Sequence, residues 1–161
     1  MANAERRFGP QRGSPTRRRR SDAGQSRLPA TVAEALIDIL RRQERPSMRD
    51  IQTELAVVCA RLGERMPARA TIYRSMAQAP PRQVRLAELP EPVRRCLYNL
   101  DDAGSVPGHQ VAFFAFHYGD TAAISFAAGL PWLDLYQAGR TRGWRPRSRG
   151  LLRAVLRRRG I

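Results

Sequence analysis

The chain has 161 residues but no lysine, and it contains only two cysteines, Cys59 and Cys96. Two cysteines this far apart supply neither a disulfide framework nor the paired spacing of a zinc site. Cys59 falls among Val57, Val58 and Leu62, which predicts a buried, unreactive thiol. The N-terminal residues are basic, but no apolar segment follows them as it does in a secretory signal peptide. We therefore expect a reducing, cytoplasmic location.

Long apolar runs are also absent. The most apolar stretch covers residues 119–144, and only thirteen residues separate Asp120 from Asp134, interrupted by Gly129 and Pro131. A helix needs about 20 predominantly apolar residues to span a bilayer. We therefore expect no membrane span, and this stretch must serve either as a packing core or as a helix-turn-helix.

The patterns of an active site are missing as well. No HxxxH, HxE, CxxC or glycine-rich phosphate-loop motif occurs among the available histidines and carboxylates, which include His109, His117, Asp101, Asp102, Asp120 and Asp134. Asp120 instead suits the N-cap of a following helix. We predict that the protein is not an enzyme, with no catalytic residue, no cofactor and no metal.

What the chain has in excess is arginine, and it lies at the two ends. The net charge is +15, and all 29 basic residues are arginine. Residues 1–27 hold eight arginines against two acids, residues 137–161 hold nine against none, and residues 28–136 are balanced. Clustered positive charge repels itself unless a polyanion neutralises it, so nucleic acid is the expected partner.

The sequence predicts a mainly α-helical fold in three parts. Residues 1–27 have almost no apolar side chains and are predicted to be a disordered basic tail. Residues 28–100 are predicted to form a helix-turn-helix domain, and residues 107–161 a helical module with a basic C-terminal helix. The turn-rich residues 101–106 would connect the two folded parts.

Local signals place the individual helices. A first helix begins near Thr31 as N-cap and ends at Pro46. The second, at 48–62, has apolar residues at spacings of three and four, a Ser47–Asp50 capping box and Gly63 as its stop. Further helices are predicted at 68–79, 90–100, 121–128, 131–142 and, capped by Ser148, at 148–159. Residues 83–89 alternate as a strand does, and 109–118 fit either a strand or a helix.

The helices at 48–62 and 68–79 form the first candidate helix-turn-helix. In the second of these helices, Ala70, Ile72 and Met76 would face the core of the domain. The types of residue that read base edges and hold phosphates would face outward: Arg69, Thr71, Tyr73, Arg74 and Gln78. The preceding helix and the strand at 83–89 would complete a trihelical unit with a short β wing.

On these residues the segment 31–90 resembles the winged or trihelical helix-turn-helix domains of bacterial regulators and transposition proteins. In those domains a Thr-Ile-Tyr-Arg stretch, present here at 71–74, commonly sits in the recognition helix. The turn at 63–67 is longer than in the tight form of the motif. The resemblance implies that the helix at 68–79 enters the major groove of DNA.

Residues 121–138 form the second candidate. Small and apolar residues fall where a tight helix-turn-helix requires them, at Ile124, Ser125, Ala128, Gly129, Leu130, Leu135 and Ala138. The outward face of its second helix, however, would carry Trp132, Leu133 and Tyr136. These side chains read bases poorly and suit a contact with the first domain, a dimer interface or another protein. Whether this unit reads DNA or packs stays open at this point.

The C-terminal arginines offer a surface for phosphate. Arg149, Arg153 and Arg157 lie at helical i, i+4 spacing opposite a stripe of Leu151, Leu152, Val155 and Leu156. Arg140, Arg142, Arg145 and Arg147 precede them and surround Trp144, whose ring could stack on the bases of RNA or a single strand.

The prediction is therefore a small, cytoplasmic, nucleoid-associated protein that binds specific double-stranded DNA. Its role would be that of a transcriptional regulator, or of a DNA-binding accessory to a mobile or toxin–antitoxin element. An RNA-binding protein that uses the arginine-rich ends is the first alternative. A protein–protein adaptor that uses the Trp132, Leu133 and Tyr136 face is the second.

Overall fold

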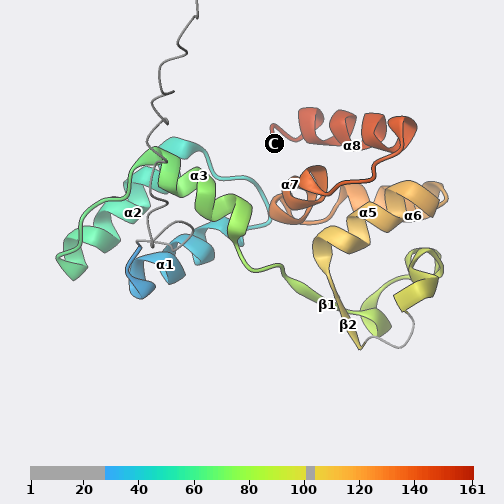
Figure 1. Ribbon diagram of the computed structural model, residues 1–161, viewed down its shortest axis with the longest axis horizontal. Coiled ribbons are helices and arrows are strands. Elements are labelled where there is room, and N and C mark those ends of the chain that lie inside the picture. Colours follow the sequence, from blue (N-terminus) through green and yellow to red (C-terminus); the bar gives the residue numbers. More distant parts are fainter. Residues whose placement is uncertain (1–27, 101–103) are drawn as a thin grey trace, which may run out of the picture.

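The computed structural model describes residues 28–100 and 104–161, and these form a mainly helical protein with two lobes (Figure 1). The predicted disordered tail, 1–27, and part of the predicted connector, 101–103, lie outside the described residues. The first lobe, which we call the N-terminal module, consists of α1 (Ala30–Leu40), α2 (Met48–Leu62) and α3 (Arg69–Gln78). The second lobe, the C-terminal module, contains everything from Gln83 onward.

The C-terminal module has a short antiparallel ribbon and five α-helices. β1 (Gln83–Arg85) pairs with β2 (Ser105–Pro107), with Val84 opposite Val106. Between the strands lie the 3-10 helix η1 (Leu86–Glu88), α4 (Glu91–Arg94) and the 3-10 helix η2 (Arg95–Leu100). After the ribbon come α5 (Gly108–Tyr118), α6 (Thr121–Ala128), α7 (Trp132–Arg140) and α8 (Pro146–Arg158).

α2 is the helix whose ends the sequence predicted best. Asp50 donates its backbone N–H to Ser47 Oγ at 3.1 Å, and the backbone N–H of Ser47 donates to Asp50 Oδ2 at 3.2 Å, which confirms the capping box. Gly63 ends the helix with a φ of 67°, the left-handed conformation that glycine adopts without strain. The predicted cap at Asp120 is also confirmed, because its side chain accepts the Ala123 N–H.

Two predicted caps are wrong, and proline explains both. α1 begins at Ala30 with Pro29 as N-cap, so Thr31 lies inside the first turn. α8 begins two residues earlier than predicted, because Pro146 occupies its first position and fixes a helical φ there. Ser148 is consequently a buried residue within α8 rather than its cap.

The two segments with strand-like patterns also differ from a simple strand. Only Gln83–Arg85 is a strand, and the rest of the predicted strand turns into η1. Residues 108–118 are a helix, α5, which buries Val111, Ala112, Ala115 and Phe116 at helical spacing. That spacing is hidden in the sequence because α5 is apolar on several sides.

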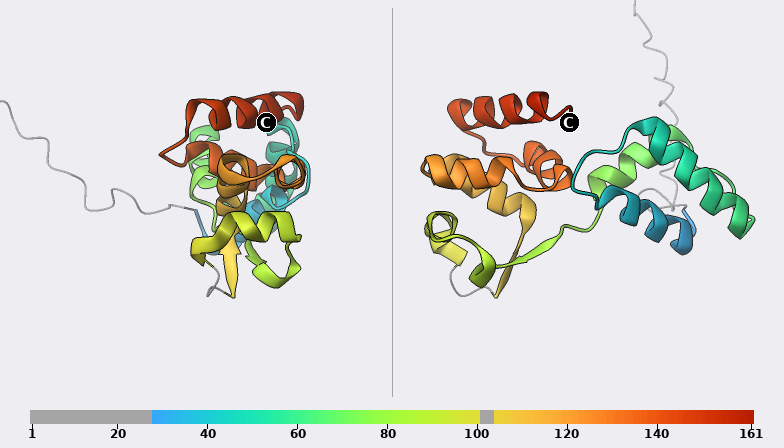
Figure 2. Two further views of the ribbon diagram at one scale, coloured as in Figure 1. Left: turned by 90° about the vertical axis from the view of Figure 1, so that its right-hand side faces the viewer. Right: turned by 180° about the vertical axis from the view of Figure 1, so that it is seen from behind.

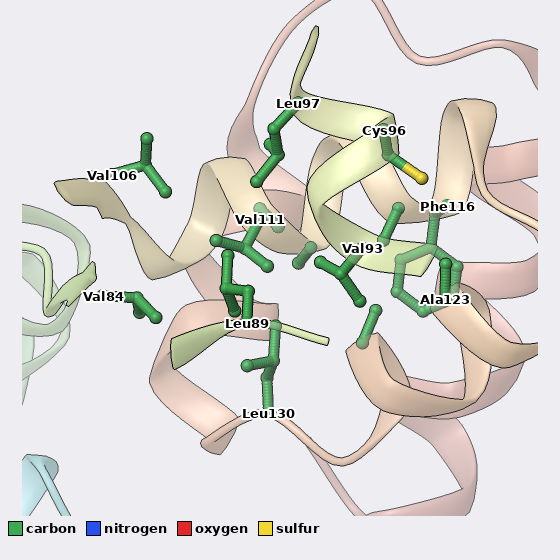
Figure 3. Close-up of a cluster of buried hydrophobic side chains, with 14 of the residues drawn as sticks. Val84, Leu89, Val93, Cys96, Leu97, Val106, Val111, Phe116, Ala123 and Leu130 are labelled. Carbon is green, nitrogen blue, oxygen red and sulfur yellow. The ribbon is translucent and has the colours of Figure 1, made fainter. Parts of the chain in front are cut away.

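The buried side chains form two clusters, and they divide near Pro80–Pro81 rather than at the predicted connector 101–106. Val84, Leu89, Val93 and Leu97 belong to one cluster with residues of α5, α6, α7 and α8, as Figure 3 shows for the residues that it labels. The segment 83–100 therefore packs with the C-terminal module. The α1–α3 segment builds the other cluster around Leu36, Leu55, Ile72 and their neighbours.

Side chains from the C-terminal module complete the core of the N-terminal module. Trp132 and Leu133, at the start of α7, lie in the α1–α3 cluster and are 1% and 7% exposed. Figures 1 and 2 show the ribbon of α7 beside the first lobe. The backbone N–H of Trp132 donates to Gln43 O at 3.2 Å, and Gln43 Nε2 donates to Gly129 O at 2.9 Å. The two modules are thus one packed body.

Arg159 joins three segments at this junction. Its guanidinium donates to Ala128 O and Leu130 O in the α6–α7 turn, at 3.1 and 2.5 Å. It also donates to Gln43 O and Glu44 Oε1 in the α1–α2 loop, both at 3.2 Å. Its side chain is only 15% exposed. Hydrogen bonds from a charged donor stabilise a fold more than neutral ones do.

We expect Arg159→Ala to lower the free energy of unfolding by about 2–3 kcal/mol, because it leaves carbonyls at the junction without their donor. Urea denaturation followed by circular dichroism measures this loss. The exposed neighbour Arg158 provides the control, since Arg158→Ala should change stability by no more than about 0.5 kcal/mol. Equal effects of the two substitutions would show that Arg159 does not hold the modules together.

Candidate nucleic-acid interface

α3 carries a polar, cationic face on the surface of the N-terminal module. Its apolar side chains Ile72 and Met76 are buried, at 0% and 2% exposure, and fix the helix against the core. Of the predicted contact residues, Arg69, Tyr73, Arg74 and Gln78 are exposed and Thr71 is half-buried. The helix contains two arginines and no acidic residue. This face is therefore positive and free of competing carboxylates along α3.

Ala70 lies on this exposed face, so its predicted place in the core is wrong. Two residues along a helix turn the side chain by about 200°. Ala70 consequently points away from the side on which Ile72 is buried. Its small side chain lowers the surface of α3 between the longer side chains Arg69 and Arg74, which allows a partner to approach the backbone closely.

Arg69 and Tyr73 are held next to each other, one turn apart. Arg69 Nη2 donates to Tyr73 Oη at 3.3 Å, and the guanidinium lies 5.7 Å from the centre of the tyrosine ring. Stacking of this kind limits the number of rotamers that the arginine visits. Less entropy is then lost when Arg69 binds a partner.

The end of α3 meets the end of α7 at a hollow that we call the junction hollow. It has a volume of about 290 Å³, and residues from both modules line it: Ala77, Gln78, Ala79, Pro81, His109, Gln137, Arg140 and Thr141. Gln137 Nε2 donates to Ala79 O at 2.8 Å and so ties α7 to the end of α3. The junction hollow brings Gln78 of the first candidate unit to the same place as Arg140.

A second hollow continues from Arg140 and Thr141 along the α7–α8 segment. Arg140, Thr141, Arg142, Trp144 and Arg149 line it together with Gly139 and Gly143. Since Arg140 and Thr141 border both hollows, Gln78 at the end of α3 and the arginines Arg140, Arg142 and Arg149 lie along one continuous surface. We call this surface the basic band.

Trp144 is half-buried in this surface and packs within the chain, so only part of its ring is open for the predicted stacking on bases. Its Nε1 donates to Ala138 O at 2.9 Å. Its ring lies 4.9 Å from the rings of both Phe113 and His117, centre to centre. His117 Nε2 in turn accepts the backbone N–H of Arg145 at 3.1 Å. These contacts hold the α7–α8 segment in place while its arginines stay exposed.

The remaining predicted arginines lie along α8. Arg147, Arg149, Arg153 and Arg157 are all exposed, whereas Leu152 is 1% exposed and anchors the helix to the core. Leu151, which the sequence placed in the apolar stripe, is 38% exposed. Figure 1 shows α8 lying across the C-terminal module, with its C-terminal end directed toward the first lobe. α8 thus extends the basic band beyond residue 149.

The predicted face of Trp132, Leu133 and Tyr136 is a packing face within the chain. Trp132 and Leu133 are buried in the core of α1–α3, and Tyr136 packs against the same cluster. α7 therefore cannot offer this face to a DNA groove or to another protein. A contact with the first domain was one of the uses that the sequence left open for it.

Sequence reasoning missed a buried ion pair beside the junction hollow. Arg82 donates from Nε and Nη2 to Asp134 Oδ2, at 3.0 and 2.7 Å, and Asp134 is only 2% exposed. The carboxylate lies against Gly108, where a Cβ atom would collide with it. Burial raises the pKa of Asp134, and the Arg82 guanidinium opposes that shift. No local pattern could reveal a pair that is separated by 52 residues.

None of the helices in the described part of the chain has the length and apolar character that crossing a bilayer requires. Among residues 28–100 and 104–161 there is also no group of three or more histidine, cysteine or acidic side chains that could hold a metal ion.

The ion pair gives a prediction with a defined pH dependence. Arg82→Ala leaves a buried carboxylate without its cation, so we expect unfolding at pH 7 to require about 2–3 kcal/mol less. The pKa of Asp134 should rise further in the variant. The deficit should therefore shrink as the pH falls through this raised pKa, because a protonated Asp134 needs no cation.

Urea denaturation of both proteins between about pH 4 and pH 7 measures this. Arg85→Ala is the control, because Arg85 is 79% exposed and forms only a 3.7 Å contact with Glu88. A deficit that stayed constant over this pH range would mean that Arg82 acts through packing alone.

Comparison with known proteins found no match to this chain. No family model matches it, and no curated protein or solved structure shows significant similarity to it. Any function proposed for the protein must therefore come from its own side chains and surfaces.

Proposed function

We propose that the protein binds specific sequences of double-stranded DNA, with α3 as the recognition helix. Its biological role would be that of a transcriptional regulator or of a DNA-binding accessory to a mobile or toxin–antitoxin element. The observation that carries this proposal is the division of α3 into two faces. One face is fixed in the core by Ile72 and Met76, and the other exposes Arg69, Tyr73, Arg74 and Gln78.

A helix that reads DNA must be both rigid and exposed. α1 packs against both α2 and α3 in a three-helix unit, and the six-residue connection from Gly63 to Ala68 precedes α3. The major groove is about 12 Å wide and admits one helix. In a helix-turn-helix the second helix enters that groove, and α3 would take this place here.

The side chains of α3 suit the reading of base edges. An arginine can donate two hydrogen bonds to guanine O6 and N7, and a glutamine can pair in the same way with adenine N6 and N7. Arg74 and Gln78 lie one helical turn apart and are both exposed. Arg69, supported by Tyr73, lies near the start of the helix, where a guanine or a phosphate could be held.

The second module would hold the phosphate backbone beside the site that α3 reads. The basic band connects Gln78 to Arg140, and Arg140 to Arg142 and Arg149. Phosphate contacts fix the register of a protein on the duplex without carrying sequence information. Because the two modules are packed together, phosphate binding by residues 140–149 would constrain where α3 lies.

The structure gives less support to the two alternatives. Trp144 is half-buried and held by its bond to Ala138 and its packing on Phe113, so only part of its ring is open to RNA bases. An adaptor that uses Trp132 and Leu133 would need the two modules to separate.

The first test of this proposal is sequence selectivity. Duplexes bound by the protein are selected from a random pool at about 150 mM salt, and their affinities are compared with that of random DNA. We expect Arg74→Ala to weaken binding of the selected duplex by about 10- to 100-fold and to relax the preference at one base pair. Arg94→Ala, which removes an exposed arginine paired with Glu91 in α4, is the control. If Arg74→Ala kept the full selectivity, α3 would not be the reader.

The second test separates reading from phosphate binding. We expect Arg149→Ala to weaken binding of the selected and the random duplex by a similar factor. The slope of log Kobs against log [salt] should fall in magnitude by about 1, because one phosphate contact is lost. Fluorescence anisotropy titrations at several salt concentrations measure both quantities. A selective loss for the chosen sequence would place Arg149 at a base edge instead.

A further inference from the structure

The junction hollow contains two buried polar atoms whose hydrogen-bonding capacity is unused. Within residues 28–100 and 104–161, neither His109 Nδ1 nor Gln137 Oε1 has a hydrogen-bond partner. Both residues line the hollow, which has a volume of about 290 Å³. A buried polar atom without a partner is destabilising, and a ligand that supplies the missing hydrogen bond removes that cost.

The hydrogen bond that Gln137 makes determines which kind of group its side-chain oxygen can bind. Its Nε2 donates to Ala79 O at 2.8 Å, so the amide is oriented and Oε1 is left as an acceptor. A group that binds there must donate a hydrogen bond.

His109 supplies a second acceptor in the same hollow. Burial lowers the pKa of His109, which favours the neutral imidazole, and the nearby Asp134 opposes that shift. With its proton on Nε2, a neutral imidazole presents Nδ1 as an acceptor. One primary amino group on an aromatic ring carries two N–H donors and can satisfy both atoms.

The rim of the hollow offers donors and positive charge. Arg140 and Gln78 are exposed at its edge, and Thr141 adds a hydroxyl group. The Arg140 guanidinium lies 5.9 Å from the centre of the Tyr136 ring, which holds it close to α7. A ligand whose ring enters the hollow would place an anionic group against Arg140.

From these groups we propose that the junction hollow is a binding site for a nucleotide whose base carries an amino group. The amino group donates to Gln137 Oε1 and His109 Nδ1, and the phosphate pairs with Arg140. The site lies between the end of α3 and the ends of α5 and α7. It does not require α3 to bind DNA.

The probes are two matched pairs of nucleotides, in which an amino group is replaced by an oxo group. AMP is compared with IMP, and CMP with UMP, by isothermal titration calorimetry at concentrations up to about 1 mM. We expect the amino-bearing member of at least one pair to bind about tenfold or more tightly than its oxo partner. The amino group brings two N–H donors to the two acceptors, whereas IMP and UMP offer a single ring N–H beside an oxo group that can only accept.

Nuclear magnetic resonance locates the site in the unaltered protein. AMP or CMP should shift the ring nitrogens of His109 and the side-chain amide of Gln137, whereas IMP and UMP should not. Arg140→Gln, which alters an exposed side chain, should weaken AMP or CMP binding by about tenfold. Arg147→Gln, an exposed arginine outside the hollow, should leave it unchanged.

Gln137→Met should remove the preference for the amino group. If this variant does not fold, which thermal unfolding shows, the spectra of the unaltered protein decide. Equal affinities within both pairs, shifts confined to other residues, or no binding of any of the four nucleotides would each overturn the proposal. Whether Arg74→Ala changes DNA selectivity is measured separately, so the two proposals can fail independently.

Discussion

Trp132 begins α7, in the C-terminal module, yet its indole lies in the core of α1–α3 and is 1% exposed. Much of what the molecule can do depends on this insertion. It buries a large aromatic surface between two small modules, each of which has a limited core of its own. Polar contacts then fix the orientation: Arg159 crosses the junction at one edge, and the bond from Gln137 to Ala79 O lies at another. Burial of apolar surface favours contact between the modules, and the hydrogen bonds select one relative orientation.

A fixed junction changes what the basic residues can do. If the modules moved independently, the arginines of α3 and those of residues 140–149 would act as two weak electrostatic sites. Held at one distance, they present charge along a single band, and binding at one part lowers the entropic cost of binding at the other. The side chains that create this rigidity are the same Trp132 and Leu133 that the sequence offered as an outward face. By burying these two side chains, α7 fixes the positions of the basic residues on the two modules relative to each other.

Sequence reasoning predicted features that depend on neighbouring residues. The limits of α2 follow from Ser47, Asp50 and Gly63, all close to the helix ends, and the cap of α6 follows from Asp120. It failed where a choice depends on distant residues. The boundary between modules, the buried Arg82–Asp134 pair and the role of Arg159 are set by contacts between segments 29 to 116 residues apart. The exposed face of α3 was largely predictable, because helical geometry determines which of its side chains share a side. Ala70 was misplaced by neglecting that geometry.

The arginines behind the net charge of +15 therefore differ in how well they can bind a polyanion. Arg159 donates hydrogen bonds to backbone carbonyls, and Arg82 donates to the buried carboxylate of Asp134. Arg42 donates from both terminal nitrogens to Glu54. Counterion release depends on arginines that can reach phosphate, which are those without such partners. On the described surface α3, residues 140–149 and α8 carry several exposed arginines, whereas Arg42 and Arg49 of the N-terminal module border a hollow that also contains Asp50 and Glu54. The partners of each arginine, as well as the number of arginines, therefore decide how much positive charge can reach a phosphate.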